Sequence, residues 1–179
     1  MQKFDTPAAI TAVLDIPAGR IQLIAAGRAD TTVEVRPANA ASGRDVKAAE
    51  QVKVEYANGE LRVEGGPAKH RALGSSGSVE VTVQLPAGSR VQATAASAQF
   101  RTVGRLGEVA FDGQQATVKV DEAATARITV QDGDVTVGRL GGDAEVSTGR
   151  GDTTGKRAQE PPSRAARPAG PAALSGCVR

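Results

Sequence analysis

The sequence predicts an all-β protein in which antiparallel hairpins lead into a β-solenoid-like or β-helix-like stack of repeated strands, with a disordered C-terminal tail. Short strands and glycine–aspartate turns recur between 101 and 152 with a period of roughly 20 residues, which is typical of a stacked β architecture. The Pro-Ala-Gly turn at 17–19 recurs at 86–88. The composition, with 40% hydrophobic but 2% aromatic residues, favours thin and regular β layers. The equivalent positions in successive repeats are Val120 and Gly138, Ile128 and Val146, Gly133 and Gly151, and Asp134 and Asp152.

The first strands are expected at 10–16 and 21–26, where apolar and polar residues alternate. Between them, Pro17-Ala18-Gly19 predicts a tight turn and therefore a hairpin, because proline presets one backbone dihedral and glycine tolerates an unusual one. A third strand is expected at 31–37, with Val33 and Val35 on one face.

The β pattern is interrupted after residue 37. Good helix formers from Arg44 to Glu50 follow Ser42 and favour a short helical turn, with an ordered loop as the alternative. Alternating residues at 52–66 flank Asn58-Gly59, a strong hairpin indicator because both residues tolerate positive φ. A glycine- and serine-rich segment at 65–77 predicts an exposed loop.

A second strand–Pro-Ala-Gly–strand unit at 78–96 repeats the opening unit and predicts another hairpin. We therefore expect one β-repeat domain over 1–152, with hairpins over 10–96 and repeat rungs over 101–152. The remaining segment, 153–179, contains four of the nine prolines and little branched apolar content, so it is expected to be disordered. Two origins stay open for this segment, a native flexible tail or the frameshifted end of a truncated chain.

Charge and cysteine content limit what kind of protein this can be and where it is expected to act. The tail carries five basic residues and one acidic residue, whereas 1–152 carries 17 basic and 19 acidic residues, so the net charge of +2 does not indicate a nucleic-acid-binding face. A single cysteine, Cys177, excludes an internal disulfide and fits a reducing compartment. With neither a signal peptide nor a long apolar span in the sequence, we expect a cytoplasmic protein, with the cell surface as the alternative.

Three stretches resemble a known family: MQKFDTPAAITAVLDIPAGRIQLIAA, VEVTVQLPAGSRV and TVQDGDVTVGRLGGDAEVSTGRGD. They resemble bacterial DUF4097-type β-strand-repeat proteins of the actinobacterial kind, which also carry the label "putative adhesins". The resemblance covers about residues 1–152. It implies a β-solenoid with further glycine–aspartate rungs and implies no enzyme activity.

Several motifs bear on possible functional sites. Arg150-Gly151-Asp152 spells an integrin-recognition tripeptide but aligns with the ordinary turn Asp132-Gly133-Asp134. Those aspartates and Asp143 do not form the dense glycine–aspartate pattern of calcium-binding β-rolls. Residues 151–156 lack the spacing of a phosphate-binding loop. His70 and Cys177 have no catalytic partners in the sequence.

We therefore expect a non-enzymatic scaffold or protein-interaction module with no catalytic residue, cofactor or metal site. Its expected partner is an unknown protein or a second copy bound through an open β edge. A surface adhesin that binds a protein or polysaccharide is the alternative. A carbohydrate-active solenoid enzyme is the third possibility, and it requires Asp112, Asp132, Asp134 and Asp152 to line one groove.

Overall fold

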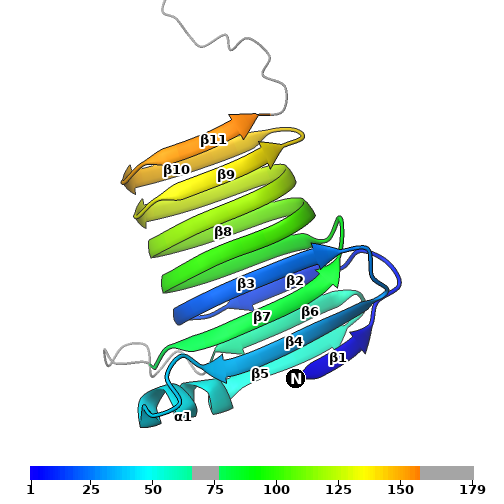
Figure 1. Ribbon diagram of the computed structural model, residues 1–179, viewed down its shortest axis with the longest axis vertical. Helices are drawn as coiled ribbons and strands as arrows, with labels where there is room; N and C mark the ends of the chain where they lie inside the picture. The colour runs from blue at the N-terminus through cyan, green and yellow to red at the C-terminus, as the bar shows by residue number, and fades with distance from the viewer. Residues whose placement is uncertain (66–76, 158–179) are drawn as a thin grey trace, which may run out of the picture.

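The computed structural model describes residues 1–65 and 77–157, and side chains to residue 154 (Figure 1). Within these residues it contains one helix and a continuous 11-stranded sheet. The helix is α1 (Gly43–Gln51). The strands are β1 (Gln2–Asp5), β2 (Thr11–Asp15), β3 (Ala18–Ala26), β4 (Asp30–Pro37), β5 (Val52–Ala57), β6 (Glu60–Gly65), β7 (Val79–Pro86), β8 (Arg90–Asp132), β9 (Val135–Leu140), β10 (Ala144–Arg150) and β11 (Thr153–Arg157). The all-β prediction is confirmed.

The sheet folds back on itself into two facing layers, which Figure 1 shows with β3 in front and β2 behind. We call the layer that contains β1, β4, β7, β3, β9 and β11 the β3 face. The layer that contains β5, β6, β2 and β10 is the β2 face. Strand β8 winds through both layers, because 90–94 pairs with β2 whereas 97–103 pairs with β3.

Each turn of the winding stacks in parallel on the preceding turn. Ile128 pairs with Val146, as the sequence repeat predicted. On the β3 face, however, Val120 pairs with Val137 and not with Gly138, so the spacing there is one residue shorter. The difference arises at one end of the coil. Ala123 pairs with Leu140 but Ala126 pairs with Ala144, so the turn at 141–143 contains one residue more than the turn below it.

The core lies between the two faces. Alternation along each strand directs one set of side chains inward, where valine, leucine, isoleucine and alanine dominate. Phe100 on the β3 face and Phe111 on the β2 face meet near the middle of the stack, with ring centroids 4.9 Å apart. The low aromatic content thus corresponds to a thin core with one central aromatic contact.

The two Pro-Ala-Gly units are not hairpins. β2 and β3 do not pair with each other, and neither do β7 and the 90–94 segment of β8. Each Pro-Ala-Gly turn instead carries the chain from one face to the other, so that β2 pairs in parallel with 90–94 and β3 pairs in parallel with β7. The reason is burial: the strands on both sides of each turn have an apolar side, and crossing the core lets both sides bury it.

Two local predictions are confirmed. β5 and β6 form an antiparallel hairpin around Asn58 and Gly59, whose φ angles are 52° and 78°. Helix α1 begins after Ser42, whose hydroxyl accepts a hydrogen bond from the backbone N–H of Asp45. The loop predicted at 65–77 lies almost wholly outside the described residues.

The tail prediction is wrong at its start. Residues 153–157 form β11, which pairs in parallel with β9 through Thr153 and Val135. The repeat therefore continues past residue 152. Thr153 and Thr154 pair with the β9 residues 18 positions earlier, which is the repeat spacing, and their β-branched side chains suit a strand. Residues 158–179 lie outside the described part of the chain.

The N-terminal end of the stack is closed by side chains. Phe4 on β1 and Tyr56 on β5 contact each other across the two layers, with ring centroids 5.3 Å apart. Nearby, Arg28 forms two hydrogen bonds of 2.8 Å to the Asp30 carboxylate and also donates to Gln84. Lys3 lies 3.4 Å from the same carboxylate. This cluster ties β1 and β7 to the turn that precedes β4.

The glycine of each glycine–aspartate turn is required by close stacking. Gly133 has a φ of +141°, and a Cβ there would lie 1.9 Å from the carbonyl oxygen of Ala116 in the turn below. Gly151 repeats this geometry on Gly133, with a φ of +127° and the same 1.9 Å approach. A side chain at either position would push neighbouring turns apart.

Gly133→Ala is expected to lower the free energy of unfolding by roughly 1–3 kcal/mol or more, because it combines an unfavourable φ with a backbone clash. Urea denaturation would measure this change. Gly27→Ala is the matched control, since a Cβ at Gly27 meets nothing within 4 Å. Equal stability of the Gly133→Ala protein and the wild type would contradict this account of the turns.

The hydrogen bonds from Arg28, aided by Lys3, lower the pKa of Asp30 from 3.8 to about 2. The unfolded chain therefore binds this proton more tightly than the folded chain, so stability present above about pH 4 is lost as the pH falls toward 2. Denaturation at a series of pH values should show a shallower acid loss for Asp30→Asn. Identical slopes for Asp30→Asn and the wild type would refute the assignment.

Candidate functional site

The outward surfaces of the two faces differ in how their charges are matched. On the β2 face, Arg90 lies 3.7 Å from Glu108 and Arg127 lies 3.2 Å from Glu145, so arginines and glutamates alternate across successive turns. On the β3 face, Arg101 and Lys119 form no ion pair with any described residue. Arg101 and Lys119 are therefore two β3-face cations whose charge no described residue matches.

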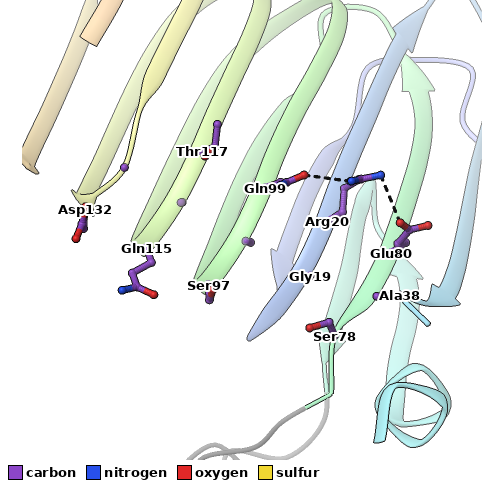
Figure 2. Close-up of a pocket in the computed structure, with 13 residues that line it drawn as sticks. Gly19, Arg20, Ala38, Ser78, Glu80, Ser97, Gln99, Gln115, Thr117 and Asp132 are labelled. Atoms are coloured by element: carbon purple, nitrogen blue, oxygen red, sulfur yellow. Dashed lines mark hydrogen bonds and ion pairs between the residues drawn. The ribbon is translucent and has the colours of Figure 1, made fainter. Parts of the chain in front are cut away.

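An open groove of about 530 Å³ crosses the outer surface of the β3 face. Arg20 on β3 lies at its centre and links two neighbouring strands, as Figure 2 shows. Its guanidinium donates to Gln99 at 3.3 Å on one side and to Glu80 at 3.4 Å on the other. The groove is lined by Gly19, Arg20, Ala38, Ser78, Glu80, Ser97, Ala98, Gln99, Gln115, Ala116, Thr117, Asp132 and Gly133.

A second hollow of about 340 Å³ adjoins this groove, because Arg20, Gln99 and Thr117 line both. Its other lining residues include Arg101 and Lys119. The complete lining is Arg20, Gln22, Gln99, Phe100, Arg101, Thr117 and Lys119, which contains three cations and no carboxylate. We call this hollow the basic hollow. It offers hydrogen-bond donors and positive charge to a ligand.

The spacing of the acidic residues in the groove can be compared with the spacing that a hydrolytic site needs. The two carboxylates lie on opposite sides of the groove (Figure 2): Glu80 is on β7, and Asp132 ends β8 just before β9, a strand four steps from β7 and so about 19 Å away at the usual strand spacing. Glycoside hydrolysis needs two carboxyl groups within about 10 Å of each other. Within 1–65 and 77–157, no group of three or more histidine, cysteine, aspartate or glutamate residues is arranged to hold a metal ion.

The four aspartates named for the enzyme alternative do not share one groove. Asp132 lines the groove on the β3 face, whereas Asp112 lines a hollow of about 250 Å³ on the β2 face. Asp134 accepts a hydrogen bond from the backbone N–H of Asp152 at 3.2 Å, so its carboxylate supports the turn above it. Asp112 and Asp132 therefore line separate hollows on opposite faces.

The Arg150-Gly151-Asp152 tripeptide is a stacked turn. The backbone N–H of Gly133 donates to the Arg150 carbonyl at 2.9 Å, and that of Val135 donates to the Asp152 carbonyl at 2.9 Å. The interpretation as turn chemistry is consistent with this geometry. His70 and Cys177 lie outside the described residues.

Sequence analysis did not identify the groove, because its residues come from distant parts of the chain. Arg20 and Gln99 are far apart in the sequence and become neighbours only through the pairing of β3 with β8. Outward polar positions on alternating strands were visible in the sequence. Their grouping depends on which strands pair, and the hairpin prediction assigned the wrong partners.

Searches of protein-family models and of curated proteins found no match to this chain. Among solved structures, the chain is similar to one titled as a "putative cell adhesion protein" from Clostridium sporogenes, with a TM-score of 0.54 and 12% identity. The match covers 87% of this chain and 98% of the other. At this identity the likeness concerns the fold alone. No helix among the described residues is long and apolar enough to cross a membrane.

Proposed function

We propose that this chain is a non-enzymatic binding scaffold of the adhesin type, which holds a partner in the groove on its β3 face. The observation that carries the proposal is the groove itself, a polar surface built from side chains on successive turns. A rigid ladder of strands holds these side chains at fixed spacings, so the surface is organised before a partner arrives.

Three further observations support the proposal. The likeness to the structure titled as a "putative cell adhesion protein" agrees with the DUF4097-type resemblance of the sequence. The carboxylates of the groove lie too far apart for paired acid–base work. One of them, Glu80, is already bound to Arg20. Action at the cell surface would require export, and cell fractionation distinguishes that case from an intracellular scaffold.

Blocking the groove tests the proposal. Thr117 is exposed and lines the groove, so Thr117→Trp should obstruct any partner whatever its charge. Beads coated with the wild-type chain would be applied to a panel of immobilised proteins and polysaccharides. We expect Thr117→Trp to lose most of the attachment shown by the wild type.

The matched control is Thr129→Trp, an exposed threonine in the middle of a strand on the β2 face. It should attach as the wild type does. Loss of attachment by Thr129→Trp alone would place the partner on the β2 face. A wild-type chain that attaches to nothing in the panel would contradict the proposed function.

Self-association is a second candidate, favoured by the last turns of the stack. Ala144 and Val146 on β10 are only partly buried, whereas Ile128, the strand partner of Val146, is fully buried. A second copy could cover this apolar end by strand pairing.

Light scattering over a dilution series tests self-association. A mass that rises above 18.2 kDa with concentration is expected if copies pair at this end. A constant mass of 18.2 kDa at all concentrations would rule this candidate out and leave the groove as the interaction surface.

A further inference from the structure

The basic hollow contains two cations that the folded chain does not neutralise. Arg101 and Lys119 both line it from neighbouring turns of β8, and neither forms an ion pair with a described residue. Two cations that line one hollow repel each other. An anionic ligand would remove this cost, so the hollow has a physical reason to bind one.

We propose that the basic hollow binds an acidic polysaccharide, that is, an extended polymer of sugars that carry carboxylate groups. The inference rests on the proposed function and specifies the class of its ligand. Arg101 and Lys119 pair with the carboxylates, and the neighbouring amide and hydroxyl side chains bind the sugar hydroxyls.

The arrangement of side chains matches an extended polymer. One row across the strands places Arg20 beside Gln99 and the next places Gln22 beside Arg101, and Thr117 and Lys119 from the following turn of β8 line the same hollow. Neighbours within a row are about 4.8 Å apart, and the two rows are about 7 Å apart along the strands. A ligand that crosses the turns therefore meets a cation or a hydrogen-bond donor at every strand.

An acidic peptide fits this surface less well. The hollow lies in the middle of the sheet, where β3 is paired on both sides, by β7 and by β8. No free strand edge is available there, so a peptide cannot add itself as a further strand. The hollow offers hydrogen-bond donors from side chains and none from a free strand edge, and such donors can bind the many hydroxyl groups of a polysaccharide.

Neutral sugars and single-stranded nucleic acids also fit less well. The only ring in the lining belongs to Phe100, which is 1% exposed and points into the core. Base recognition on single strands depends on exposed aromatic stacking platforms. Recognition in the basic hollow therefore depends on charge and hydrogen bonds.

Binding of the full chain to polygalacturonate, measured by titration calorimetry, tests the proposal. Arg101→Gln/Lys119→Gln should bind at least tenfold more weakly than the wild type. Arg90→Gln/Arg127→Gln removes the same two charges from the β2 face and should stay within twofold of the wild type. Neutral dextran should not bind, and poly-L-glutamate should bind at least tenfold more weakly than polygalacturonate. Added salt should weaken the polygalacturonate complex.

Four results would overturn the proposal: no binding of polygalacturonate by the wild type, wild-type binding by Arg101→Gln/Lys119→Gln, an equal loss in both double variants, or equal affinity for poly-L-glutamate. The last result would assign the hollow to acidic peptides. Thermal unfolding of each variant checks that the fold is intact. If Thr117→Trp loses bead attachment while Arg101→Gln/Lys119→Gln binds like the wild type, the acidic polysaccharide is wrong and the proposed function stands.

Discussion

Parallel backbone pairing between successive turns of the coil is the interaction on which the rest of this structure depends. It brings the backbone of each turn against the one below, which is why Gly133 and Gly151 have no room for a side chain. It also stacks the inward-facing side chains of each turn on those of the next turn. A thin core of branched aliphatic residues can therefore extend along the stack without a deep centre.

The same register organises the outer surfaces into rows. On the β2 face these rows place arginine beside glutamate, as in Arg127 and Glu145, so charges cancel between turns. On the β3 face Arg101 and Lys119 line one hollow that contains no carboxylate, so positive charge accumulates there. Both faces are built by the same parallel stacking of successive turns of β8, and their outward residues differ. In the proposed function, this difference between the outward residues is what assigns the binding site to one face.

A fold of this kind tolerates wide sequence change, which explains a similar structure at 12% identity. Stacking requires inward apolar residues, glycine at the tight turns and β-branched residues in the strands, and it leaves the outward positions free. Likeness of fold therefore carries little information about the ligand. The ligand must be argued from the outward side chains, and here those are Arg20, Gln99, Arg101, Thr117 and Lys119.

The sequence by itself determined the fold class, the approximate repeat period, the Asn58-Gly59 hairpin and the helix after Ser42, because each follows from local backbone preferences or from spacing along the chain. It did not determine the partners of β2 and β3. A Pro-Ala-Gly turn shows that the chain reverses, but burial of both apolar sides decides whether the next strand pairs alongside or crosses to the other layer. Only the tertiary structure brought Arg20 beside Gln99, and with them the groove, since their proximity depends on strand pairing between distant segments of the chain.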